Sequence, residues 1–311
     1  MDGKQLQTQY KEHLSDFNNW NQKEHAEDFI LYPKNIGYHL CIDETALSKG
    51  ELYTILTNRD KHGRKGTIVA IVKGTKAEDV INVLLKIDAD KRNQVKEITL
   101  DMAGSMQKIA KRCFPGAMQV VDRFHVSKLV YEAVQDLRIA YRWQVMKDEN
   151  RKIKEAKAKG ESYEPKEVSN GDTLRQLLAR SRYLLFKAPD KWLQSQKVRA
   201  KLLFEQFPDI KSVYYYALRL GKIFSDYTDK DVARAKLALW YNEIEEFGYD
   251  TFTTVANSIE NHYERILNYF VNRSTNAAAE AFNAKIKAFR ASFRGVVDKR
   301  FFLYRLAKVY A

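Results

Sequence analysis

The sequence predicts an α/β fold followed by a large block of helices, and two patterns carry this prediction. In the segment 36–126, short runs of β-branched and aromatic residues end at Gly, Ser and charged turns, which is typical of strands. From about residue 173 to residue 271, apolar residues recur at helical spacing, so nearly all of that segment is expected to be helical.

The expected elements of the first segment follow the order βββαβαβ. This order is that of the ribonuclease H-like fold, so we expect such a core, with a carboxylate on its first strand beside one that ends its fourth. The expected strands are 38–47, 51–57, 66–74, 95–101 and 117–126, and the expected helices are 77–87, 102–114 and the long helix 127–146 that comes after the last strand.

Four segments describe the expected organisation of the chain. Residues 1–35 are polar and mixed and predict an irregular arm. Residues 36–150 form the first part of the core, and residues 151–271 form an all-helical insertion that interrupts it. Charges mixed with Gly, Pro, Ser and Asn at 155–172 predict a solvated connection. Residues 272–311 supply a final helix and a basic tail.

The composition bounds the class of protein. The net charge of +13 indicates a polyanionic partner, with nucleic acid as the leading candidate and a basic balance that serves only solubility as the alternative. Within 285–311, eight Lys and Arg residues face only one acid, Asp298, so the positive charge is localised. Cys41 and Cys113 form neither a disulfide framework nor a zinc motif. With no membrane-spanning run and no signal peptide, a cytoplasmic protein is expected, associated with the nucleoid when it is bound to DNA.

Asp43 and Asp101 are the first candidate site residues. Asp43 lies in the middle of an apolar strand, where a charge costs several kcal/mol unless it meets a partner or a metal. Asp101 ends the apolar strand 95–101, although by itself it could simply cap the next helix. Glu44 is expected to point to the opposite face of the strand and ranks lower.

The final helix supplies the third acid. Its apolar side is lined by Phe residues and Ile286, and its other side predicts one polar stripe. A solvated surface is the alternative interpretation of such a stripe, although two amides aligned around one acid argue against it. The stripe consists of Asn276, Glu280, Asn283 and Lys287.

These acids suit two-metal phosphoryl transfer. Two Mg²⁺ ions about 3.5–4 Å apart need hard oxygen ligands while leaving sites for water and phosphate. Asp43, Asp101 and Glu280 could supply such ligands, with Mn²⁺ as a possible substitute metal, and Lys287 could steady a phosphate. No protein nucleophile is then required.

A second motif, Asp122-Arg123-Phe124-His125, is expected at the end of the last strand. Asp122 and His125 could support the site by bonding a phosphate or an acid, and Arg123 could contact DNA. The alternative is that His125 is simply buried between a strand and a helix, with its hydrogen bonds made inside the protein.

These fragments together resemble the DDE transposases of bacterial insertion sequences, particularly the ISL3 group and its split relatives of the ISAon type. The resemblance extends from Ile42 to Lys287. It implies that Asp43, Asp101 and Glu280 bind the metal ions, and that the helical block interrupts a ribonuclease H-like core before its last helix. It also implies that 122–125 matches the [C/D]xxH motif of several such groups.

The resemblance implies partners as well. DNA is expected as both transposon end and target, bound by a homo-oligomer. The motif at 122–125 and the basic tail predict the DNA contacts, which are Arg123, Lys285, Arg290, Arg294 and Arg300. The family usually carries a DNA-recognition region before the first catalytic Asp, whereas only about 40 residues precede Asp43 here. The chain therefore resembles the catalytic half of a split transposase, with a separate N-terminal protein for sequence recognition, or equally a truncated remnant.

Three rivals to a strand-transferring transposase stay open at this point. A ribonuclease H-like nuclease would hydrolyse DNA without joining strands, and an inactive remnant would bind DNA without turnover. A tyrosine recombinase would use one of the 18 Tyr residues as a nucleophile and leave a covalent link between protein and DNA.

Overall fold

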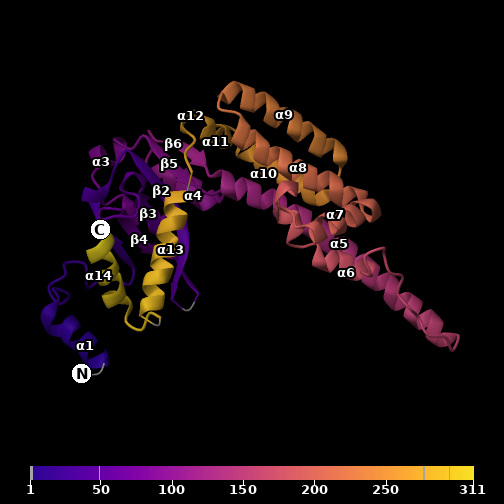
Figure 1. The fold of residues 1–311 in the computed structure, drawn as a ribbon. Helices are drawn as coiled ribbons and strands as arrows, with labels where there is room; N and C mark the ends of the chain where they lie inside the picture. Colours follow the sequence, from indigo (N-terminus) through magenta and orange to yellow (C-terminus); the bar gives the residue numbers. More distant parts are fainter. Residues whose placement is uncertain (1–2, 49, 276, 294) are drawn as a thin grey trace. The chain divides into compact units, whose positions relative to one another are not determined.

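The computed structural model describes residues 3–48, 50–275, 277–293 and 295–311. The chain divides into two compact units (Figure 1). The first unit contains the residues up to Asp122 together with Glu264–Ala311, and the second contains Arg123–Tyr263.

The first unit is built on a mixed sheet. Its strands lie in the spatial order β1-β4-β3-β2-β5-β6. The first four in this order pair antiparallel, and β2, β5 and β6 pair parallel. Within the described residues the six strands are β1 (Phe29–Leu31), β2 (His39–Ser48), β3 (Glu51–Asn58), β4 (Ile68–Lys73), β5 (Glu97–Leu100) and β6 (Met118–Val121).

Burial explains why these segments are strands. All four residues of β5 are buried, as are Ile68–Val72 of β4, so both strands are covered on both faces. The buried part of β4 is apolar throughout, whereas β5 buries Glu97 and Thr99 together with Ile98 and Leu100. Strands β2, β3, β4 and β5 lie where the sequence predicts them, and β6 starts as predicted but ends at Val121. The mixed α/β class is therefore confirmed.

The expectation of an irregular N-terminal arm is wrong. This segment contains helix α1 (Gly3–Gln9), a π-helical turn (Tyr10–Leu14) and strand β1, which pairs with β4 at the edge of the sheet. Phe17 and Ile30 are buried in the unit. The strand was missed because it is only three residues long and its partner lies about forty residues further along the chain.

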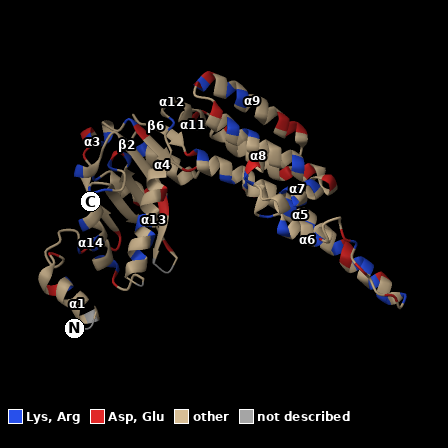
Figure 2. Cartoon of the chain, in the orientation of Figure 1, with Lys and Arg blue, Asp and Glu red and all other residues tan. Residues whose placement is uncertain are grey.

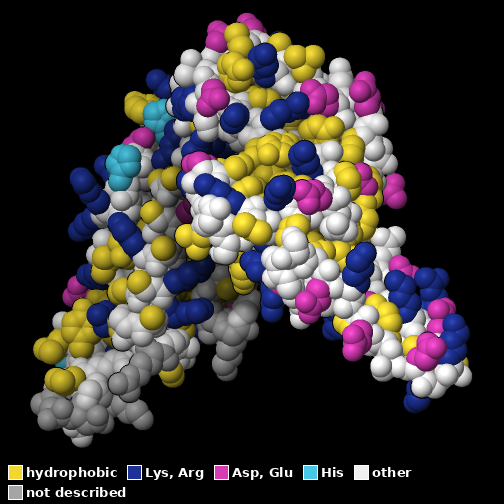
Figure 3. Space-filling model, turned by 45° about the vertical axis from the view of Figure 1, so that its right-hand side comes forward, with side chains coloured by type: hydrophobic (Ala, Val, Ile, Leu, Met, Phe, Trp, Pro, Cys, Tyr) yellow, Lys and Arg dark blue, Asp and Glu magenta, His cyan; other side chains and the backbone are white. Residues whose placement is uncertain are grey.

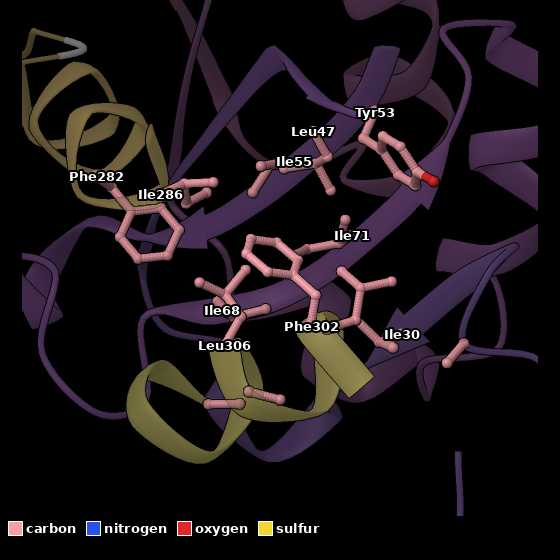
Figure 4. Packing of buried hydrophobic residues seen from close by; sticks show 14 residues of the cluster. Ile30, Leu47, Tyr53, Ile55, Ile68, Ile71, Phe282, Ile286, Phe302 and Leu306 are labelled. Carbon is pink, nitrogen blue, oxygen red and sulfur yellow. The ribbon is translucent and has the colours of Figure 1, made fainter. Parts of the chain in front are cut away.

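Helices α13 and α14 cover one face of the sheet, and Figure 4 shows the packing. Phe282 and Ile286 of α13 and Phe302 of α14 meet Ile55 and Ile71 of the sheet in one buried cluster. Asp298 caps α14 by accepting a hydrogen bond from the backbone N–H of Phe301. The helices of this unit after α1 are α2 (Ala77–Leu84), α3 (Ala89–Asn93), α4 (Gly104–Cys113), α11 (Tyr263–Leu267), α12 (Tyr269–Asn272), α13 (Ala277–Ser292) and α14 (Lys299–Tyr310), with 3₁₀ turns at Pro33–Asn35 and Arg59–Lys61.

The second unit is helical, as its periodicity predicts. Thr173 opens α6 with a capping box, and Gly248 ends α9 in the left-handed region that glycine favours (φ 67°). Trp240, Leu237 and Tyr214 are buried in its core. Its helices are α5 (Arg123–Ala158), α6 (Leu174–Arg180), α7 (Gln194–Gln206), α8 (Pro208–Asp226), α9 (Lys230–Phe247) and α10 (Asp250–Asn261), with 3₁₀ turns at Leu184–Phe186 and Pro189–Lys191.

Helix α5 differs from its expected form in two respects. It starts at Arg123, so Arg123, Phe124 and His125 lie in its first turn and not in the preceding strand, which ends at Val121. It also packs against α6, α8 and α10 and so belongs to the second unit, whereas the division was expected after this helix. Its second half is rich in charge, and Figure 3 shows Lys, Arg, Asp and Glu side chains interspersed along it.

In the part of the chain that the structure describes, no helix has the length and apolar character needed to cross a membrane.

Candidate active site

Strand pairing brings Asp43 and Asp101 to the same level of the sheet. In the parallel pair of β2 and β5, Leu40 lies opposite Ile98 and Cys41 opposite Thr99. Continued by two residues, this register sets Asp43 beside Asp101, which directly follows β5. Side chains at matched positions of neighbouring strands point to the same face of a sheet. The two carboxylates therefore emerge together.

Asp43 is half-buried and its carboxylate is held from two sides. Its Oδ1 accepts a hydrogen bond from the backbone N–H of Glu44 at 2.8 Å. Its Oδ2 accepts one from Nδ2 of Asn283 on α13, at 2.7 Å. Asn283, which helical spacing places on the same stripe as Glu280, thus contacts Asp43, the acid of the first predicted strand. Because a carboxylate has about four lone-pair sites, both oxygens keep capacity for a further ligand.

Asp101 is held by its own loop. Its Oδ1 accepts a hydrogen bond from the backbone N–H of Ala103 at 2.8 Å, immediately before α4 begins at Gly104. Asp101 does not cap α4 as the alternative interpretation proposed, because the N-cap residue is Ala103 and no side chain caps this helix. The hydrogen bond instead orients the carboxylate within the loop that leads from β5 into α4.

Glu44 adds a third carboxylate to this end of the sheet. Burial raises the pKa of the Glu44 carboxyl, and the nearby carboxylates of Asp101 and Asp43 raise that pKa further. The strand pattern ranks Glu44 low because neighbouring strand residues point to opposite faces. The effect of both acids on its pKa indicates that Glu44 nevertheless adds negative charge close to them.

Helix α13 runs beside β2 and carries the third predicted acid. Nη1 of Arg290 donates to the backbone oxygens of Ala46 and Leu47, each at 3.4 Å, and Asn283 reaches Asp43 further back along both elements. Glu280 lies three residues before Asn283, so the two are neighbours on the helix surface. Glu280 is exposed, as is Lys287. Asn276, the first member of the predicted stripe, lies outside the described residues.

A buried ion pair fixes the segment that leads into α13. Glu97, at the start of β5, is only 1% exposed, and its Oε1 lies 2.7 Å from Nη2 of Arg59. Its Oε2 accepts a hydrogen bond from Nδ2 of Asn272 at 2.9 Å. Burial opposes ionisation of Glu97, but hydrogen bonds from Asn272 and Ser274 and the charge of Arg59 outweigh it and lower its pKa.

This network was not expected from the sequence. In the sequence, Glu97 looks like an ordinary surface acid at the start of a strand. Its partners Arg59 and Asn272 lie far away along the chain. The only available signal was a charged residue directly before an apolar run.

The predicted supporting motif is divided between the two units. Asp122 is 1% exposed and comes directly after β6, where the pairing of Leu100 with Val121 sets it beside Asp101. Burial is the main cause of a raised pKa of the Cys41 thiol, and the carboxylates of Asp43 and Asp122 add to it. Arg123 and His125 belong to the second unit, where His125 is half-buried next to Phe124.

The described His, Cys, Asp and Glu side chains include no ready-made group of three around a common metal position. The donor chemistry nevertheless suits a hard divalent cation, because Asp43 and Asp101 emerge side by side and like charges accumulate around Glu44. Glu280, exposed on α13 three residues before Asn283, offers a further carboxylate for such a cation.

The expected basic tail is a folded part of the first unit. Figure 2 shows Lys and Arg along α13 and α14, but several of these side chains have partners inside the unit. Nζ of Lys285 donates to the backbone oxygen of Gly63 at 2.9 Å, and Arg300 pairs with Glu27 at 3.0 Å. Arg294 lies outside the described residues.

Comparison with known proteins identifies the family. A family model described as a transposase, of the DDE type and the ISL3 group, matches residues 40–306. No curated protein matches the chain. The matched range includes β2, where Asp43 lies, and α13, where Glu280 lies.

The chain therefore belongs to the DDE transposases of the ISL3 group. A transposase acts on DNA, which agrees with the net charge of +13.

Proposed function

We propose that this chain is the catalytic subunit of an insertion-sequence transposase, which cleaves DNA strands at the ends of the element and joins the freed 3′-OH to target DNA. One observation carries the proposal. Asp43 and Asp101 emerge at one level of neighbouring parallel strands, and the Asn283–Asp43 hydrogen bond holds the helix that carries Glu280 beside them. The strand order of the sheet agrees with a ribonuclease H-like core, interrupted by the helical unit before α13.

Asp43, Asp101 and Glu280 are the proposed metal ligands. When bound, two Mg²⁺ or Mn²⁺ ions would activate the attacking water or hydroxyl and stabilise the leaving 3′ oxygen. Asn283 positions the Asp43 carboxylate through its 2.7 Å hydrogen bond. The backbone N–H of Ala103 does the same for Asp101.

Other residues have proposed supporting roles. Exposed Lys287, four residues after Asn283 on α13, is placed to contact a phosphate of bound DNA. Asp122 adds negative charge beside Asp101 on the next strand. Roles for His125 in supporting the site and for Arg123 in contacting DNA stay predictions, as does the role of Asn276.

The finer statements about partners are also proposals. A separate N-terminal protein would recognise the terminal repeats, and a homo-oligomer would hold both DNA ends. The location would be the cytoplasm, with association with the nucleoid on DNA.

The experiment uses the full chain and a supercoiled plasmid that carries the DNA flanking the coding sequence. We expect Mg²⁺-dependent strand cleavage that falls about a thousandfold, or about 4 kcal/mol of transition-state stabilisation, in Asp43→Asn, Asp101→Asn and Glu280→Gln. Asp79→Asn, an exposed acid of the same unit, is the matched control and should keep full activity. Cleavage that survives in one variant removes that residue from the metal site.

Pre-cleaved ends separate the remaining alternatives. Joining of such ends to a target plasmid indicates a transposase, whereas cleavage without joining indicates a nuclease. DNA binding without either reaction indicates an inactive remnant. A protein–DNA adduct that persists in denaturant would indicate a tyrosine recombinase.

A further inference from the structure

A second charged surface of the first unit lies at the end of the sheet where β2 begins. Two adjacent hollows, of about 620 Å³ and about 420 Å³, share Lys34, Lys65 and Ala311 in their linings. We call this surface the lysine groove and define it by Lys34, Lys61, Lys65, Lys91 and Lys308, which line one or both hollows. Figure 2 shows blue residues around the end of α14, where Lys308 lies.

Positive charge dominates the groove. Among the described residues that line the two hollows, Asp60 has the only acidic side chain, and Nδ1 of His39 lies 2.9 Å from its Oδ1. Lys308 pairs with Asp16 at 2.8 Å. Within the described ranges, Lys34, Lys61 and Lys65 are exposed and have no ion pair. Three cations thus face solvent without an acidic partner.

The backbone beneath these lysines is fixed. Asn35 follows Lys34, and its Nδ2 donates to the backbone oxygen of Ile68 at 2.7 Å. Nδ2 of Asn58 donates to the backbone oxygen of Asn35 at 2.9 Å. Both asparagines are buried. The sheet therefore presents Lys34 from a rigid turn, which limits the loss of conformational entropy when the groove binds an anion.

Aromatic rings accompany the charge. Tyr38 lines the smaller hollow and is 52% exposed, with Nζ of Lys96 4.8 Å from its ring centroid. Half-buried Trp20 and Tyr32 line the larger hollow. Exposed rings among lysines are typical of surfaces that bind single strands, because the cations follow the phosphates while unpaired bases stack on the rings.

We propose that the lysine groove binds single-stranded DNA, with Lys34, Lys61 and Lys65 contacting phosphates and Tyr38 stacking on a base. The proposal deepens the proposed function and rests on it, because strand cleavage at the acidic end of the same sheet would leave a free 3′ end that the groove could hold after it unpairs from its complement. Tyr38 directly precedes β2, and Asp43 lies five residues further on. At about 3.3 Å per residue this is about 16 Å, a span of a few nucleotides.

The test measures binding of fluorescently labelled oligo-dT to the full chain by fluorescence anisotropy, with EDTA present and at several salt concentrations. The triple variant Lys34→Gln/Lys61→Gln/Lys65→Gln should bind at least 10-fold more weakly at low salt. Its plot of log K against log salt should be shallower by about 2, because each lost phosphate contact contributes about 0.7. Tyr38→Ala should weaken binding about 10-fold with little change in that slope.

A triple variant of α5, Lys152→Gln/Lys154→Gln/Lys157→Gln, is the matched control. It removes the same charge from exposed positions of the other unit and should retain most of the binding. Equal losses in the two triple variants would overturn the proposal, because they would indicate net charge alone. An unchanged salt slope in the groove variant would overturn the proposal as well. So would a variant that binds oligo-dT normally and loses binding only to a duplex of the same length.

Two further measurements keep the result interpretable. If the triple variant unfolds at a lower temperature than the wild type, the single variant Lys65→Gln replaces it and should show about a third of the slope change. Because EDTA removes the metal ions, this test measures binding without cleavage. If the proposal for the groove is wrong, the groove variant will bind oligo-dT as tightly as the wild type. Failure of the proposed function would show as a lack of Mg²⁺-dependent cleavage despite normal binding.

Discussion

The two ends of the sheet in the first unit carry opposite charge and present it by different means. At the level of Asp43 and Asp101, acids are half-buried on or directly after strands, and backbone or amide donors hold each carboxylate. At the start of β2, lysines extend from turns into solvent. A site for small divalent cations needs fixed oxygens, whereas a surface that binds a flexible strand needs only an accumulation of cations.

Glu97 is the residue that joins these two ends. It begins β5 on the side of the lysine groove, while β5 ends directly before Asp101. We expect Glu97→Gln to lower the free energy of unfolding by about 3–5 kcal/mol, because the charge of largely buried Arg59 would lose its partner. Urea unfolding at neutral pH measures this, with Glu78→Gln, an exposed acid paired with Lys108, as the control. A loss no larger than that of the control would mean that the pair is structurally unimportant.

We also expect Glu97→Gln to change how the free energy of unfolding depends on pH. The pKa of folded Glu97 lies below the value of 4.5 expected of an unfolded glutamate. Its ionised form therefore stabilises the fold above about pH 4.5, and this contribution is lost as the pH falls through the lower folded pKa. Between neutral pH and pH values below 4.5, wild-type stability should fall more steeply than that of Glu97→Gln. Parallel curves would contradict the assignment.

A variant of Asn283 tests whether hydrogen-bond donors orient the carboxylate of Asp43 for metal binding. Asn283→Ala removes the hydrogen bond to Oδ2 of Asp43, and residues that orient metal ligands typically contribute 10- to 100-fold to metal affinity. We expect the Mg²⁺ concentration for half-maximal thermal stabilisation to rise about 10-fold or more. Ser292→Ala, at the exposed end of the same helix, should leave it unchanged. Equal responses of the two variants would show that Asn283 does not orient the ligand.

The sequence predicted the parts of the fold that depend on local pattern. The strands from β2 to β6 are apolar runs bounded by turns, and their order was sufficient to set Asp43 beside Asp101. The segment after β6 was misassigned because apolar Phe124 and Val126 alternate with polar Arg123 and His125 as in a strand, although the helix has already begun at Arg123. Period-2 and helical patterns overlap in such short runs.

Contacts between distant residues were beyond sequence reasoning. Asn283 and Asp43 are 240 residues apart, and the Glu97–Asn272 hydrogen bond spans 175 residues. Helical spacing placed Asn283 and Glu280 on one stripe but could not tell which of them faces the sheet. The lysine groove was also missed, because only Lys308 belongs to the basic run at 285–311, and the other four lysines come from separate segments between residues 34 and 91.

Arg300 tests that basic run against the groove, with the smallest expected effect. Its ion pair with Glu27 is partly exposed, so Arg300→Gln should change the free energy of unfolding by less than about 1 kcal/mol. The sequence predicted a phosphate contact here, and loss of one would make the salt dependence of duplex binding shallower by about 0.9. Because Arg300 already has an acidic partner, we expect a much smaller change, unlike that of the groove variant. A full change would restore Arg300 as a DNA contact and extend the positive surface from Lys308, near the end of α14, to the start of that helix.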